Sequence, residues 1–112
     1  MHISSGAPWE SKAGYSRAVR IGNIIEVAGT VSIKDGKPFA ADDPYQQTLR
    51  IFEIIEKALY SAGAEMKDII RTRMYLTDIS HWEEVVRAHG EVLRGICPAA
   101  SLIGVQALID PA

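Results

Sequence analysis

The side chains best suited to chemistry in this chain are its three histidines, above all His89. An imidazole is the usual general base near neutral pH. His89 falls within the apolar stripe of the second of two expected helices, which favours a buried, hydrogen-bonded structural histidine. The run Arg87-Ala88-His89 is not a metal-binding spacing, and no carboxylate lies at a helical offset that would pair with His89. His81 is expected to face solvent and His2 is terminal, so no metal site is predicted.

Two arginines and the single cysteine are the other side chains that could take part in chemistry. Arg71 and Arg73 lie two residues apart on a strand expected at residues 69–77, so both point to one face. We expect them to form surface or intersubunit ion pairs, with Arg73 as the alternative contributor to a cleft. Cys97 has only Arg94 as a basic neighbour, which does not indicate a reactive thiolate. The chain contains no phosphate loop, dinucleotide fingerprint or nucleophile elbow, so no cofactor is expected.

Composition and charge limit the classes of partner. The 112 residues fit one domain spanning residues 1–112, with 47% hydrophobic and 23% charged side chains. A net charge of −2 and a pI near 5.9 give no electrostatic footprint for nucleic acid or an anionic membrane. No apolar run is long enough to span a bilayer, and the N-terminus lacks the pattern of a signal peptide. The single cysteine allows no intramolecular disulfide, and a cytoplasmic location is expected.

The N-terminal half of the chain reads as strands joined by tight hairpins. Residues 1–14 are rich in Ser, Gly and Pro and are expected to be irregular, with one short strand. Gly22-Asn23 and Asp35-Gly36 tolerate the positive φ that two-residue hairpin turns require. These turns separate a short strand, a long strand and an edge strand, expected at residues 16–21, 24–33 and 37–40.

The two expected helices have clear boundary signals. Asp43 is a good N-cap, Pro44 suits the first helical position, and Gly63 can end the helix in a left-handed conformation. Ser80 and Glu83 form a capping-box pattern before the second helix. Two further strands are expected around that second helix, at residues 69–77 and 101–109.

The strand at residues 69–77 alternates in polarity. Its core-facing side chains are expected to be Ile70, Thr72, Met74 and Leu76. The order of the elements predicts an α+β domain in which two amphipathic helices pack on one face of a mixed sheet.

A series of short motifs runs along nearly the whole chain: Gly14-Tyr15-Ser16-Arg17-Ala18-Val19, Gly22-Asn23-Ile24-Ile25-Glu26-Val27-Ala28-Gly29-Thr30, Gln47-Thr48-Leu49, Ala62-Gly63-Ala64, Asp68-Ile69-Ile70-Arg71-Thr72 and Pro98-Ala99. Through these motifs the chain resembles the Rid/YjgF family, whose RidA-like members deaminate reactive imines and enamines. The resemblance implies a chorismate-mutase-like (YjgF-like) fold, a homotrimer packed sheet against sheet, and small-molecule clefts between subunits.

The resemblance implies that the cleft uses six positions of this chain: Tyr15, Ala28, Gly29, Val86, Ala100 and Ser101. Tyr15 would stack on a small planar substrate, or alternatively pack at the subunit boundary. Gly29 would allow close approach of a ligand, or alternatively form a β-bulge. His89 and Arg73 are further candidate contributors to the cleft.

The implied cleft departs from the family pattern at its polar positions. Family deaminases carry Pro-Ala-Arg where this chain has Pro98-Ala99-Ala100, and the arginine holds the substrate carboxylate. Such a pair is bidentate and worth roughly 1.5–3 kcal/mol, so an α-imino acid would lose its anchor. Val86 replaces a family asparagine, Ala28 replaces a serine, and Leu102 takes a position often held by cysteine or threonine.

These departures favour a homotrimer that binds small metabolites between its subunits without 2-imino acid deaminase activity. The alternative is an enamine or imine deaminase, a hydrolase, that acts on a different and less anionic substrate. A chorismate-mutase-like enzyme is disfavoured because a dianionic substrate needs several cationic side chains. A nuclease or translation regulator is disfavoured by the acidic balance.

Family chains continue into a final strand past the point matching Ala112, so we expect a truncated protein or a strand outside this sequence, with a sheet edge exposed.

Overall fold

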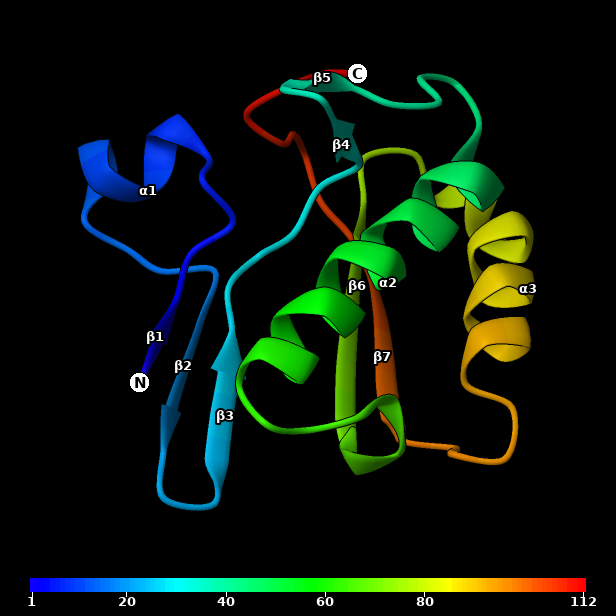
Figure 1. The fold of residues 1–112 in the computed structure, drawn as a ribbon. Coiled ribbons are helices and arrows are strands. Elements are labelled where there is room, and N and C mark those ends of the chain that lie inside the picture. The colour runs from blue at the N-terminus through cyan, green and yellow to red at the C-terminus, as the bar shows by residue number, and fades with distance from the viewer.

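The computed structural model of the protein describes all 112 residues, and Figure 1 shows the arrangement of its elements. Helices and strands follow one another in the order β1 (His2–Ile3), α1 (Pro8–Ala13), β2 (Ala18–Ile21), β3 (Ile24–Val27), β4 (Ile33–Lys34), β5 (Lys37–Pro38), α2 (Pro44–Ser61), η1 (Met66–Asp68), β6 (Arg71–Leu76), η2 (Ile79–His81), α3 (Trp82–Val92) and β7 (Ala99–Gly104). The α+β class predicted from the sequence is confirmed.

The N-terminal strands form an antiparallel sheet in the order β1-β2-β3. Both predicted hairpin turns are confirmed. Ile21 pairs with Ile24 around Gly22-Asn23, where Gly22 has a φ of 60°. Asp35-Gly36 joins β4 to β5, with φ values of 53° and 77°. Glycine accepts such angles readily, and aspartate is among the residues that tolerate them.

The single long strand predicted for residues 24–33 is wrong, because residues 28–32 form no strand and separate β3 from β4. A contact from outside the segment explains the break. The guanidinium of Arg17 donates hydrogen bonds to the carbonyl oxygen of Gly29 and the hydroxyl of Thr30. These groups therefore bind a side chain instead of a neighbouring strand.

The first long helix, α2, begins and ends as predicted. The carboxylate of Asp43 accepts a hydrogen bond from the backbone nitrogen of Gln46 at 3.1 Å, and Pro44 is the first helical residue. Gly63 follows the helix with a φ of 85°, the left-handed conformation expected of a terminator. The helix buries four side chains: Thr48, Phe52, Ala58 and Leu59.

The C-terminal half is a β-α-β unit in which β6 and β7 are parallel and α3 connects them. Alternation along β6 is confirmed, because its half-buried side chains are Thr72, Met74 and Leu76, and its exposed ones are Arg71, Arg73 and Tyr75. The predicted core position of Ile70 is wrong. The strand begins at Arg71, two residues later than predicted, and Ile70 is 82% exposed.

The predicted capping box at Ser80 and Glu83 is also wrong. A short 3-10 turn, η2, precedes α3, and Asp78 caps that turn. Its carboxylate accepts hydrogen bonds from the backbone nitrogen of Ser80 at 3.0 Å and from the Ser80 hydroxyl at 2.6 Å. The Ser80 hydroxyl therefore donates to Asp78 and does not cap α3.

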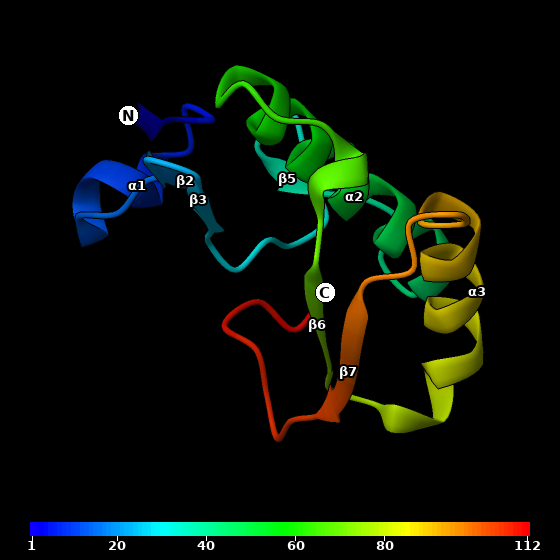
Figure 2. The same ribbon diagram turned by 90° about the horizontal axis from the view of Figure 1, so that it is seen from below.

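Both long helices, α2 and α3, lie on one side of β6 and β7, as the view from below shows (Figure 2). Between them the core is built mostly of small and medium side chains: Ala58, Leu59, Ala62, Val85, Ala88 and Leu93. The other side of the strands carries large side chains that remain exposed: Ile21 (76%), Ile24 (66%), Tyr75 (50%) and Ile103 (38%). No backbone pairing joins β3 to β6, so the sheet is divided into antiparallel and parallel parts.

Candidate functional site

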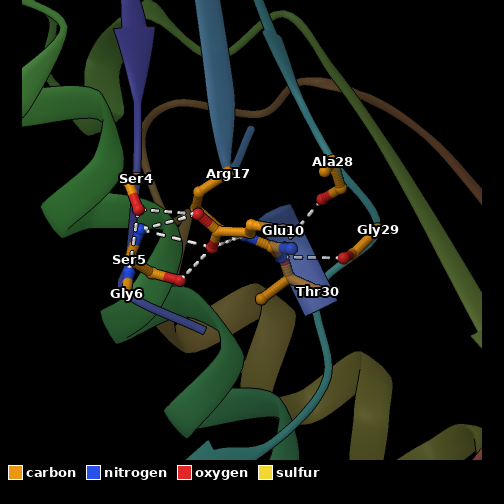
Figure 3. A network of polar contacts seen from close by, with 8 residues as sticks. All are labelled: Ser4, Ser5, Gly6, Glu10, Arg17, Ala28, Gly29 and Thr30. Carbon is orange, nitrogen blue, oxygen red and sulfur yellow. Dashed lines mark hydrogen bonds and ion pairs between the residues drawn. The ribbon is translucent and has the colours of Figure 1, made fainter. Parts of the chain in front are cut away.

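The predicted site residues near the N-terminus gather around Arg17. Tyr15 follows α1 directly and is 40% exposed, and its ring centroid lies 5.7 Å from Cζ of Arg17. Nη1 of Arg17 donates to the carbonyl oxygen of Gly29 at 2.8 Å and to Oγ1 of Thr30 at 2.9 Å, as Figure 3 shows. The Thr30 hydroxyl in turn donates to the carbonyl oxygen of Ala28 at 2.9 Å. The Arg17 guanidinium thus contacts Tyr15 and Gly29 directly and is linked to Ala28 through Thr30.

Glu10 completes this network from α1. Its side chain is buried beside Arg17, with 3.9 Å between the carboxylate and Nε. Burial alone would raise the pKa of Glu10, but hydrogen bonds from Ser5 and Ser4 and the charge of Arg17 outweigh it and lower the pKa. Glu10 therefore stays ionised at neutral pH, and it fixes the N-terminal segment against residues 28–30 (Figure 3).

Sequence reasoning missed both α1 and the Glu10–Arg17 pair. A signal for the helix was present, because Pro8 occupies its first turn and Gly14 ends it with a φ of 74°. No local sequence pattern predicts the Glu10–Arg17 ion pair, because burial of a charged pair depends on contacts between distant segments.

The remaining predicted residues form a second group at α3 and β7. Val86 and His89 lie one helical turn apart, and Nε2 of His89 is 2.8 Å from Oγ1 of Thr72 on β6. Thr72 is paired with Ala100 in the parallel register, so their side chains are neighbours on the helix-bearing side of the strands. Val86 is 43% exposed and Ala100 is also exposed.

His89 is partly buried and hydrogen-bonded, as the sequence predicted for a structural histidine. Its ring makes an edge-to-face contact with Phe52 of α2, with 5.8 Å between centroids. Burial lowers the pKa of His89 below its ordinary value of 6.5, so the neutral imidazole predominates at pH 7. A neutral ring offers one donor and one acceptor, and Nε2 is engaged with Thr72.

Ser101 and Arg73 lie on the opposite side of the strands from Ala100. The two are paired in the β6–β7 register, and neighbouring residues of a strand point to opposite faces. The Ser101 hydroxyl accepts a hydrogen bond from Nη2 of Arg71 at 2.5 Å. The structure therefore groups Ser101 with the exposed arginines and separates it from Ala100, Val86 and His89.

The two groups of predicted site residues lie on different elements of one chain. Figures 1 and 2 both place α1, β2 and β3 on one side of the strands β6 and β7, and α3 on the other side. No hydrogen bond or ring contact in the structure joins Tyr15, Ala28 or Gly29 to Val86 or Ala100. Within one chain the two groups are therefore separate.

Other features of the surface do not coincide with these groups. A hollow of about 320 Å³ is lined by Leu49, Phe52, Glu53, Glu56, Met66 and Val92. No group of three or more His, Cys, Asp or Glu side chains is placed to hold a metal ion. None of the helices is both long enough and apolar enough to cross a membrane.

The chain is similar to proteins of one family, both in sequence and in fold. The family model described as Endoribonuclease L-PSP matches residues 5–112. A crystal structure from Mycobacterium tuberculosis, described as a member of the highly conserved YjgF/YER057c/UK114 family, is 45% identical with a TM-score of 0.89 and covers 99% of this chain and 88% of that one. An uncharacterised Streptomyces coelicolor protein is 36% identical over 108 residues, 96% of this chain and 81% of that protein. RidA from an Antarctic Psychrobacter is 22% identical with a TM-score of 0.80, over 96% of this chain and 83% of that one, which indicates the same fold.

Proposed function

Because this chain belongs to the endoribonuclease L-PSP family, also called Rid/YjgF, we propose that it is a homotrimer that binds small metabolites in clefts between its subunits. We further propose that it lacks the family's 2-imino acid deaminase activity. The proposed loss of deaminase activity rests on Ala100, which supplies a methyl group where family deaminases have an arginine.

The separation of the two residue groups supports a shared cleft. Tyr15 and Gly29 contact Arg17 beside α1, whereas Val86 lies on α3 and Ala100 lies on β7. Exposed apolar side chains on the helix-free side of the strands give a surface on which copies can associate: Ile21, Ile24, Tyr75 and Ile103. Association would bury this apolar surface, and that burial would add to the stability of a domain whose own core is small.

The loss of cationic groups supports a changed ligand. Arg71 and Arg73 project from the side of β6 opposite Ala100, and Arg87 stacks on the ring of Tyr45 at 4.0 Å. These arginines are therefore directed away from the methyl group of Ala100. A carboxylate beside Ala100 would lose its hydration without gaining a charged partner.

The test is an assay with 2-aminoacrylate, generated from serine by a dehydratase, in which release of pyruvate is followed. We expect the protein not to accelerate pyruvate release. Ala100→Arg is the companion variant, and a gain of activity would mean that the rest of the cleft is competent. Clear acceleration by the wild-type protein would contradict the proposal.

One observation favours a second candidate, an enamine or imine deaminase that acts on a less anionic substrate. The Thr72 and His89 side chains keep a hydroxyl and a neutral imidazole beside Ala100, and such groups can orient water. An assay of ammonia release from an uncharged enamine separates the two candidates, because only a deaminase would accelerate that release above the rate of spontaneous hydrolysis.

A further inference from the structure

We propose that the Thr72–His89 pair is the hydrogen-bonding floor of a subsite for a small uncharged ligand that carries an amide, imine or carbonyl group. The subsite, defined here as Thr72, Val86, His89 and Ala100, rests on the proposed intersubunit cleft. It adds the class of ligand and the residues that select it.

The register of the parallel strands places a hydroxyl beside an uncovered methyl group. Thr72 and Ala100 are partners in the β6–β7 ladder, so their side chains project next to each other on one side. Ala100 is exposed, whereas Thr72 is only half-buried. A ligand seated on Ala100 therefore lies beside Oγ1 of Thr72.

The Thr72 hydroxyl has hydrogen-bonding capacity to spare. A threonine hydroxyl has one donor and two acceptor positions. Its single side-chain partner in the structure is Nε2 of His89, at 2.8 Å. At least one position therefore stays free for a polar group of the ligand.

His89 keeps this hydroxyl oriented. The imidazole is confined by its position on α3, by the edge-to-face contact with Phe52, and by the hydrogen bond to Thr72. A hydroxyl whose partner is fixed in this way is pre-organised, which reduces the entropic cost of binding. Val86, one turn before His89, presents an exposed apolar side chain beside the pair.

The charges around the subsite select against anions. Its four side chains include no cation, because burial keeps His89 neutral at pH 7. Arg71 is directed to Ser101 on the other side of the strands, and Arg87 to the ring of Tyr45. An amide or carbonyl group can use the free hydroxyl position, whereas a carboxylate would be left without a counter-charge.

Propionamide and propionate make a matched pair of probes, because they differ mainly in charge. We would titrate each at pH 7.5 into isotope-labelled protein and follow the His89 ring signals and the Ala100 amide by NMR. Propionamide should shift both signals in a saturable way, and propionate should not. Equal responses to the two probes would overturn the proposal.

Three variants sharpen the test. Thr72→Val keeps the branched shape and removes the hydroxyl, and it should raise the Kd for propionamide roughly five-fold. Thr77→Val makes the same change at an exposed threonine just past the end of β6 and should leave the Kd unchanged. Thr72→Ser restores a hydroxyl and should restore binding, which also guards against misfolding of Thr72→Val. Unchanged binding in a folded Thr72→Val protein would contradict the proposal.

The NMR signals of the Tyr15 and Gly29 backbone amides show whether a negative result contradicts this subsite alone or the proposed cleft as well. If propionamide shifts these amides but not the His89 signals, the cleft stands and the subsite is wrong. If no probe shifts either group in a protein that light scattering finds to be a trimer, both are wrong.

Discussion

Glu10 and Arg17 are the two charged residues buried most completely, at 5% and 8% exposure. Their network reaches from α1 to residues 28–30, and Nε of Arg17 is buried without a hydrogen-bond partner. A guanidinium in this state depends on the nearby charge of Glu10. Glu10→Gln should therefore lower the free energy of unfolding by about 2 kcal/mol at pH 7, measured by urea denaturation. Glu83→Gln changes an exposed acid at the start of α3 and should have little effect.

The same substitution predicts a pH dependence with a definite sign. The pKa of Glu10 is lowered from 4.5 in the folded protein, so its stabilising effect is complete above 4.5 and is lost as the pH falls through the folded value. The difference in stability between wild type and Glu10→Gln should therefore shrink on acidification. A difference that persisted unchanged to pH 2 would contradict the role given to the charge.

The lowered pKa of His89 gives a second residue-scale prediction. Burial lowers its pKa from 6.5, so the unfolded chain binds a proton more readily than the folded protein. Stability should therefore decrease as the pH falls below about 6.5 and stop decreasing below the folded pKa. An NMR titration should place the His89 midpoint below 6.5, and His89→Gln should flatten the acid-side loss of stability. A midpoint above 6.5 would be inconsistent with the buried, neutral ring.

At the scale of elements, local signals were sufficient where no other side chain competed for the same backbone groups. The hairpin turns and the start of α2 depend on residues within a few positions, and all were predictable. The break after β3 was not predictable, because Arg17 contacts Gly29 from twelve positions away. The cap before α3 was missed although its partner is local, because Ser80 donates to Asp78, two residues before it, and is not available to pair with Glu83. The site shows the same division. Candidate positions could be named, but the Thr72–His89 contact joins two elements and no spacing reveals it.

The cap of α2 gives an element-scale prediction. Asp43 satisfies the backbone nitrogen of Gln46 through its carboxylate at 3.1 Å. Asp43→Ala should cost about 1 kcal/mol of stability, because a helix-end donor loses its acceptor. Asp43→Ser keeps a capping oxygen and should recover most of that loss in the same denaturation experiment. An alanine variant as stable as wild type would mean that solvent replaces the cap fully.

At the scale of the whole molecule, the helix-free side of the strands is the surface through which the proposed trimer would associate. Tyr75 and Ile103 are paired across β6 and β7 and project together from this side, at 50% and 38% exposure. On β2 and β3, Ile21 and Ile24 are also paired and exposed. An apolar surface of this kind is typical of an interface between subunits. We therefore expect light scattering to give three times the 12.3 kDa chain mass.

Tyr75→Asp tests whether this side makes the trimer. The new carboxylate would lie in the interface without a partner, and an unpaired charge there disfavours association strongly. Light scattering should therefore find mainly monomer. Tyr60→Asp is the matched control, because Tyr60 is 60% exposed near the end of α2, on the helix layer that covers the other side. If both variants remained trimeric, the interface would lie elsewhere. If both dissociated, the effect would come from added negative charge and not from the position of Tyr75.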